Sequence, residues 1–110
     1  MAQNWHQIGK LGDLEEDEPI ATEIDGRKIA AYLLGDEIYI LDDICPHEDV
    51  LLSSGFPEGD QVICPKHKAA FQMQTGKCTK GPGPQPPDLP SLGIHEVKVE
   101  DDKIFARLAD

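Results

Sequence analysis

The sequence has few cysteines, few aromatic residues and no long apolar run. Its 110 residues include three cysteines, and aromatic residues make up 5% of the chain. Three cysteines cannot form a complete set of disulfides, and the first ten residues contain no apolar stretch of signal-peptide length, so we predict a reducing, cytoplasmic location. The longest apolar run, residues 29–34, is far shorter than the roughly 20 residues that span a membrane. We therefore predict no membrane segment.

Basic residues are also scarce. The chain has 10 Lys and Arg against 21 Asp and Glu, for a formal net charge of -11 at pH 7. Such a chain is repelled by nucleic-acid phosphates and by anionic lipid headgroups. The charge balance therefore argues against binding to nucleic acid or to a membrane surface. It favours a cationic protein partner.

The length and the hydrophobic fraction of 39% predict one domain, residues 1–110, with a single thin core. Turn residues recur about every ten positions, and the intervening segments are short, β-branched and often alternating, which is typical of small all-β domains. The chain is expected to be a monomer. Strands are expected at residues 5–8, 20–24, 27–34, 37–41, 61–64, 70–74, 94–100 and 103–108.

Two segments do not fit strands. Residues 42–59 form a long polar loop, and loops of this length inside a small domain are usually functional. Residues 80–91 contain five of the nine prolines. Because strands are expected on both sides of this segment, we interpret it as a stiff loop packed on the domain rather than a linker.

Two short motifs carry the chemistry. Cys45 and His47 form C-x-H; after sixteen intervening residues, Cys64 and His67 form C-x-x-H. Structural zinc sites usually pair ligands of one kind two to five residues apart, whereas each motif here offers one thiolate and one imidazole. This division suits two adjacent metal ions, as in a Rieske centre, where two histidines replace two cysteines on one iron. The pairing expected on this basis is Cys45 with Cys64 on one iron and His47 with His67 on the other.

The sequence around these motifs resembles the Rieske-type ferredoxins. Leu52 to Gly55 (LSSG) is similar to the L-S-x-G of that family, and Phe71 to Gly76 (FQMQTG) is similar to its F-x-x-x-T-G. The resemblance implies a small antiparallel β-sandwich with two cluster-binding loops, about 42–59 and 64–70, at one tip. It also implies one 2Fe-2S cluster, with Cys45, His47, Cys64 and His67 as ligands.

The second motif departs from the family pattern. This chain has Lys66 where the family often has an aromatic residue, and Lys68 where it often has glycine. If the backbone at position 68 needs a positive φ, a lysine there is strained. Where respiratory Rieske proteins carry a Ser and a Tyr that donate hydrogen bonds toward the cluster, this chain has Ala69 and Phe71. Fewer donors predict a midpoint potential at the low end of the Rieske range of roughly -150 to +300 mV.

The chain has room for a cluster but no flavin or nicotinamide motif, so we interpret it as an electron carrier that is not an enzyme by itself. The resemblance implies that it passes electrons from a flavin-dependent NADH reductase to the terminal oxygenase of a bacterial aromatic ring-hydroxylating system, docking at the cluster tip. One alternative is a small zinc-binding interaction module using the same four residues. Another is the small Rieske-fold subunit of a nitrite reductase. A Cys-His nucleophile pair is disfavoured, because hydrolytic chemistry would also need an orienting group and an oxyanion site and the sequence gives no reason for two such pairs.

The remaining notable residues have structural interpretations. Cys78 is expected to be a spare thiol, His95 a partly buried strand residue, His6 a surface residue and Trp5 a core anchor. The acidic run 13–18 is expected to be solvated.

Charges of both signs are expected at the tip. Residues 64–81 contain four lysines and no acid, while the start of the first loop, residues 42–49, carries four acids. The lysines are Lys66, Lys68, Lys77 and Lys80, and the acids are Asp42, Asp43, Glu48 and Asp49. These side chains are either ordinary surface charges or set the orientation of a partner at a docking face.

Overall fold

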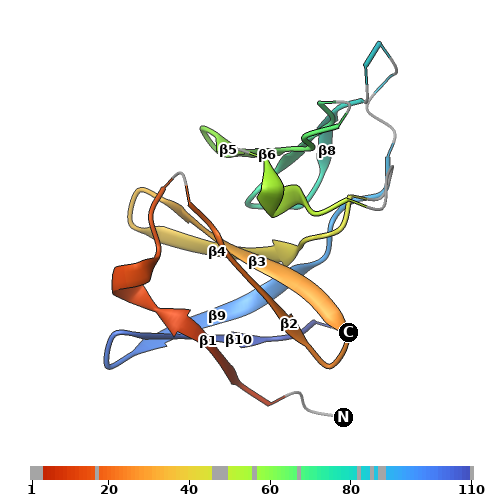
Figure 1. Cartoon of the computed structure of the whole chain (residues 1–110). Helices are drawn as coiled ribbons and strands as arrows, with labels where there is room; N and C mark the ends of the chain where they lie inside the picture. Colours follow the sequence, from red (N-terminus) through yellow and green to blue (C-terminus); the bar gives the residue numbers. More distant parts are fainter. Residues whose placement is uncertain are drawn as a thin grey trace.

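The computed structural model describes residues 4–16, 18–45, 50–55, 57–66, 68–81, 83–84, 86 and 89–109. Two antiparallel sheets make up the molecule, a large one in the lower part of the view and a small one above it (Figure 1). This confirms the predicted all-β antiparallel fold. In chain order the elements are β1 (His6–Lys10), η1 (Leu11–Asp13), β2 (Ile20–Ile24), β3 (Arg27–Leu34), β4 (Glu37–Asp42), η2 (Leu52–Ser54), β5 (Pro57–Glu58), β6 (Gln61–Ile63), β7 (Ala70–Gln72), β8 (Cys78–Lys80), β9 (Ile94–Glu100) and β10 (Lys103–Arg107).

The large sheet has the strand order β1-β10-β9-β4-β3-β2, and its two edge strands, β1 and β2, pack against each other. Tight turns set its hairpins. Between β2 and β3, Asp25 and Gly26 both have positive φ, at 51° and 83°. Asp101 and Asp102 do the same between β9 and β10. Such turns match the twist of antiparallel strands, which explains why these dipeptides could be recognised in the sequence.

The small sheet has the order β5-β6-β7-β8. Its β6 and β7 correspond to predicted strands and enclose the second motif. β5 and β8 were not predicted, because they have two and three residues and no apolar alternation. β5 and the short helix η2 both lie within the segment that was expected to be loop.

The prediction of a single core is wrong. One hydrophobic cluster lies inside the curved large sheet, and a second lies between that sheet and the small one. β3 and β4 supply both: Ala30 and Leu41 belong to the second cluster, whereas Ile29, Ala31 and Ile40 belong to the first. Because successive side chains of a strand point to opposite faces, two strands buried on both sides serve two cores at once.

Leu89, in the proline-rich segment, packs against the second cluster. Just beyond this segment, the Leu92 N–H donates to the Gly76 carbonyl at 2.7 Å. A Cβ at Gly76 would lie 2.2 Å from the Leu92 carbonyl oxygen, so this crossing requires glycine. The contact holds the start of β9 against the turn that follows β7.

Candidate metal centre

The first loop leaves β4 and is fastened by a buried carboxylate. Asp43 is 1% exposed and accepts hydrogen bonds from the backbone N–H and the hydroxyl of Ser53, at 2.7 and 2.6 Å. Its own carbonyl accepts from the Leu52 N–H at 2.8 Å. Burial raises the pKa of Asp43, against the hydrogen bonds from Ser53 and the charge of Lys28, which lower it. Asp43 is therefore a structural residue, and its predicted place among tip surface charges is wrong.

Cys45 lies where the two sides of this loop pair through backbone hydrogen bonds. Its N–H donates to the Val50 carbonyl at 3.0 Å, and Ile44 pairs with Leu51 in an isolated antiparallel bridge. The Cys45 side chain is 2% exposed. Both flanks of the first motif are thus held together by backbone hydrogen bonds.

Cys64 occupies the equivalent place in the second loop. Its N–H donates to the Ala69 carbonyl at 2.7 Å, and its carbonyl accepts from the Lys68 N–H at 3.1 Å. The Cys64 side chain is fully buried. Lys68 has a φ of 65°. The backbone at this position therefore does adopt the positive φ that strains a lysine. Each cysteine therefore closes its loop by bonding the carbonyl five residues later.

His47 and His67 lie outside the described residues, as do Glu48 and Asp49. Both histidines fall in sequence within the hydrogen-bonded spans that begin at Cys45 and Cys64. Among the described side chains, no group of three or more His, Cys, Asp or Glu could hold a metal ion. The predicted ligand set is represented in the described structure by its two cysteines.

Gly55 allows the two loops to touch. A Cβ at this position would lie 2.9 Å from the Ile63 carbonyl oxygen and 3.3 Å from Cβ of Pro65. A hollow of about 240 Å³ lies beside this contact; among its lining residues are Ser54, Gly55, Pro65 and Lys68. The glycine of the LSSG segment is thus explained by the close approach of the first loop to the second.

The donor chemistry fits a thiolate-ligated metal centre. Cys45 and Cys64 are buried thiols from different loops and belong to the same hydrophobic cluster. The cluster also includes Leu52, Ala69 and Phe71, so its surroundings exclude water. Ala69 and Phe71, the positions predicted to lack hydroxyl donors, are both fully buried.

Cys78 is a third buried thiol of this cluster, and its Sγ lies 3.3 Å from the Lys80 carbonyl oxygen. The hydrogen bond keeps its sulfur on the β8 backbone. This agrees with its interpretation as a thiol outside the ligand set.

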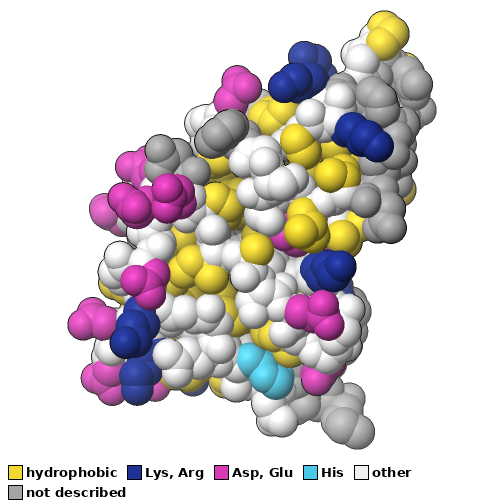
Figure 2. Space-filling model, viewed as in Figure 1, with side chains coloured by type: hydrophobic (Ala, Val, Ile, Leu, Met, Phe, Trp, Pro, Cys, Tyr) yellow, Lys and Arg dark blue, Asp and Glu magenta, His cyan; other side chains and the backbone are white. Residues whose placement is uncertain are grey.

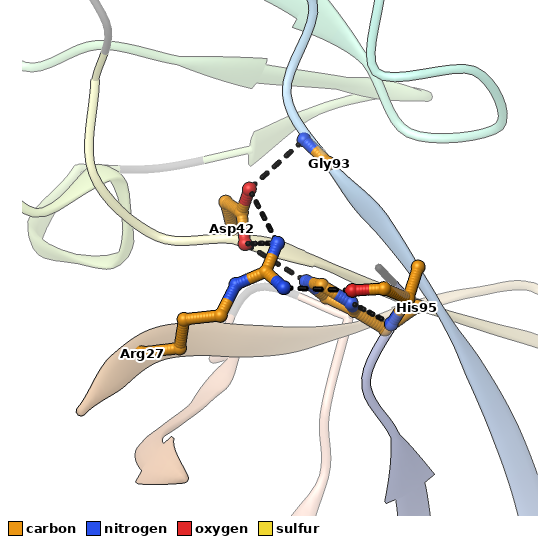
Figure 3. Close-up of polar contacts among 5 residues, drawn as sticks. Arg27, Asp42, Gly93 and His95 are labelled. Atoms are coloured by element: carbon orange, nitrogen blue, oxygen red, sulfur yellow. Dashed lines mark hydrogen bonds and ion pairs between the residues drawn. The ribbon is translucent and has the colours of Figure 1, made fainter. Parts of the chain in front are cut away.

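A second polar network lies at the base of the first loop (Figure 3). Asp42 accepts hydrogen bonds from Arg27, from the backbone N–H of Gly93 at 3.1 Å and from His95 Nε2 at 2.8 Å. Arg27 also donates to the Ala109 carbonyl at 2.7 Å. Burial acts to raise the pKa of Asp42, but the hydrogen bond from His95, the charge of Arg27 and the Gly93 N–H together hold it below its ordinary value. Asp42 is thus engaged within the fold and does not belong to a docking face.

Sequence reasoning missed this network, although it placed His95 correctly on a partly buried strand. The His95 side chain is fully buried, deeper than expected. The residues come from β3, β4, β9 and the C-terminal segment, and no local pattern links positions so far apart. The one sequence feature that pointed to this network was a histidine and an aspartate near the ends of predicted strands.

Trp5 is not the core anchor that was predicted. Its ring is half-buried, with Lys98 Nζ and Arg107 Cζ each 4.7 Å from the ring centroid. His6 is likewise half-buried rather than exposed. Both lie at an edge of the large sheet, where burial is incomplete. The described acidic residues of the run 13–18 are exposed, as expected.

Comparison with known proteins agrees with this geometry. A family profile, the Rieske [2Fe-2S] domain, matches residues 4–103. The chain is 33% identical to the "Naphthalene 1,2-dioxygenase/salicylate 5-hydroxylase systems, ferredoxin component" of Ralstonia sp., covering 98% of this chain and 99% of that protein. It is 32% identical to the "Anthranilate 1,2-dioxygenase ferredoxin subunit" of Burkholderia cepacia, covering 87% and 89%.

A solved structure gives the same result. The structure described as "Complex of reduced oxygenase and oxidized ferredoxin in carbazole 1,9a-dioxygenase" includes a chain that matches with a TM-score of 0.81 and 29% identity, covering 96% of this chain and 94% of that one. Within the described residues, no helix is long and apolar enough to cross a membrane.

Proposed function

The chain belongs to the Rieske 2Fe-2S domain family, and on that premise we propose that it is the ferredoxin of a bacterial aromatic ring-hydroxylating oxygenase system. Its relatives are ferredoxin components, which carry electrons and are not catalytic alone. The chain carries one Rieske 2Fe-2S cluster. The observation that carries the proposal is the match to such components over nearly the whole length of both chains.

The four motif residues are the proposed ligands. Cys45 and Cys64 hold one iron and His47 and His67 hold the other, which is the Rieske arrangement. Support comes from the two buried thiols and from the similar closure of the two loops by Cys45 and Cys64. When bound, such a cluster takes up and returns one electron.

The fold would hold the cluster in a fixed position and partly shield it from water. The Cys45–Val50 and Cys64–Ala69 hydrogen bonds fix the two loops, and the hydrophobic cluster shields the thiolate side from water. In the proposed route, electrons arrive from a flavin-dependent NADH reductase and leave to the terminal oxygenase. Both partners dock at the loop tip in turn.

Metal and sulfide analysis tests the cofactor and separates it from a zinc module. We expect two irons and two acid-labile sulfides per chain, with a Rieske-type EPR signal after reduction. One zinc ion in a colourless protein would contradict the proposal. Cys45→Ser and His47→Cys should each change or abolish the EPR signal, whereas Cys78→Ser should preserve it because Cys78 lies outside the ligand set.

Reconstitution tests the role. The holoprotein is mixed with NADH, a flavin-dependent ferredoxin reductase and the terminal oxygenase of an aromatic ring-hydroxylating system, and product formation is measured. We expect turnover to require this chain and to saturate with its concentration. Equal turnover without the chain, or with the cluster-free Cys45→Ser variant, would refute the assignment.

A further inference from the structure

Acidic and basic residues are divided unevenly along this molecule. Residues 61–81, which include β6, β7 and β8, contain four lysines and no Asp or Glu, so the rest of the chain holds all 21 acids. The four lysines are exposed. Figure 2 shows basic side chains, with one acidic side chain beside them, over the small-sheet end of the visible face; most of the visible acidic side chains lie below and to the left, with further basic side chains among them. Strands β6, β7 and β8 with their loops are thus a basic region on a strongly acidic protein, while the remaining strand of the small sheet, β5, carries the exposed Glu58.

Three of these lysines lie at the same end of the β7–β8 hairpin as the second loop. Lys66 and Lys68 belong to that loop, and Lys80 pairs with Ala70, the residue at which β7 leaves it. Lys77 lies at the opposite end of the hairpin, where its carbonyl accepts from the Gln72 N–H. We call Lys66, Lys68 and Lys80 the basic tip.

Lys68 is the most informative of the three. Its φ of 65° is a conformation that glycine adopts freely and that side chains resist. Its N–H is bonded to the Cys64 carbonyl, so the second loop fixes its position next to a proposed ligand. Lys68 also lines the hollow between the two loops, together with Gly55, Pro65 and the acidic Glu58. A strained residue in a loop that carries a proposed ligand calls for a reason beyond folding, and here the side chain brings a positive charge to the tip.

We propose that the basic tip is a docking surface for an acidic patch that surrounds the redox centre of a partner protein. This inference rests on the proposed function and adds the sign of the contact. At physiological ionic strength, charges farther away than about 8 Å are largely screened, so a docked partner senses the basic tip and the neighbouring Glu58 more than the acids of the large sheet. The net charge of -11 then disfavours polyanions that would cover the whole molecule, whereas a compact acidic patch can be accommodated.

The first test uses two small oxidants of opposite charge. Dithionite-reduced holoprotein is mixed with ferricyanide in a stopped-flow instrument at low ionic strength; one electron passes to ferricyanide, giving ferrocyanide. We expect Lys68→Glu to react at least about threefold more slowly than the native protein, with the difference shrinking as salt is added. With the cation cobalt(III) tris(phenanthroline), which takes one electron to become cobalt(II), Lys68→Glu should react faster than the native protein.

Lys77→Glu and Lys103→Glu are matched controls, because each is exposed and changes the net charge by the same amount. Lys103 lies on β10 in the large sheet. If all three variants slow ferricyanide equally, only net charge matters and the inference is overturned. Lys68→Gln, which keeps the backbone constraint and removes the charge, should lie between Lys68→Glu and the native protein.

The second test uses a 12-residue polyglutamate peptide as the acidic probe. We expect the peptide to slow ferricyanide oxidation of the native protein and of Lys103→Glu, and to leave Lys68→Glu unaffected. Equal inhibition of all variants, or none, would overturn docking of an acidic patch. In every variant the EPR signal of the cluster should be unchanged. Absence of the Rieske EPR signal from the reduced native protein would instead refute the proposed function.

Discussion

Asp42 Oδ1 lies 2.8 Å from His95 Nε2, and this pair connects the base of the first cysteine loop to β9 (Figure 3). The other ring nitrogen of His95, Nδ1, accepts from the Ala109 N–H at 3.0 Å. Because a backbone N–H can only donate, Nδ1 is the unprotonated nitrogen and Nε2 carries the proton toward Asp42. One buried imidazole therefore connects the cysteine-loop base with the last residues of the chain.

Replacing Asp42 tests this connection through its pH dependence. The pKa of Asp42 is lowered in the fold, so its contribution is full above the unfolded pKa and disappears as pH falls through the folded value. We expect Asp42→Asn to reduce the free energy of unfolding at pH 7 by about 1–2 kcal/mol, because a charged acceptor is lost. Urea unfolding of both proteins from pH 7 to pH 3 should show the difference narrowing below about pH 4. A difference independent of pH would contradict the role of the carboxylate.

Ser53→Ala should weaken the first loop. The hydroxyl of Ser53 is 2.6 Å from Oδ2 of the buried Asp43, whereas the hydroxyl of the neighbouring exposed Ser54 donates to the Leu51 carbonyl. Removing a donor from a buried carboxylate costs about 1–3 kcal/mol. We expect Ser53→Ala to lower the melting temperature and speed release of iron to a chelator. Ser54→Ala is the control and should change either quantity little.

Gly55→Ala should separate the two loops. The added Cβ would be 2.9 Å from the Ile63 carbonyl oxygen, and backbone on one side must move. We expect a loss of about 1–3 kcal/mol, together with faster loss of the visible absorption of the cluster. Gly12→Ala, where nothing lies within 4 Å of the new Cβ, is the control. Equal cluster lifetimes in the two variants would show that the loop contact does not matter.

Lys68→Gly should stabilise the protein. The positive φ of Lys68 is unfavourable for a residue with a side chain by about 1–2 kcal/mol, and glycine removes this strain. Part of that gain is offset because glycine has a larger conformational entropy in the unfolded chain. A net gain of about 0.5–1 kcal/mol is expected in chemical unfolding. Lys66→Gly is the comparison, since no positive φ is found there. A loss of stability in Lys68→Gly would mean that the lysine side chain contributes more than the strain removes.

Ala69→Ser should raise the midpoint potential. Ala69 is fully buried beside Cys64, at a position predicted to have lost a hydroxyl donor. A hydrogen bond favouring the reduced site by about 1 kcal/mol raises the potential by about 40 mV for one electron. Redox titration of Ala69→Ser and of the control Ala70→Ser measures this. A native midpoint well above zero would contradict the expected low potential.

Several features of this protein could be determined from its sequence alone. The strands that alternate or carry β-branched residues were found, because period-two patterning and dipeptides such as Asp25-Gly26 act locally. The two motifs identified the family because ligand types and their spacing are properties of the chain itself. The complete ligand set stays a prediction, since only its cysteines are among the described residues.

The tertiary structure decided the rest. Burial of β3 and β4 on both faces produced two hydrophobic clusters, which composition could not distinguish from one. Asp42 and Asp43 are indistinguishable from surface acids in the sequence, yet one meets His95 across the sheet and the other is buried under Ser53. Such roles depend on which distant segments meet, and long-range pairing is set by the packing of the whole chain rather than by any local pattern.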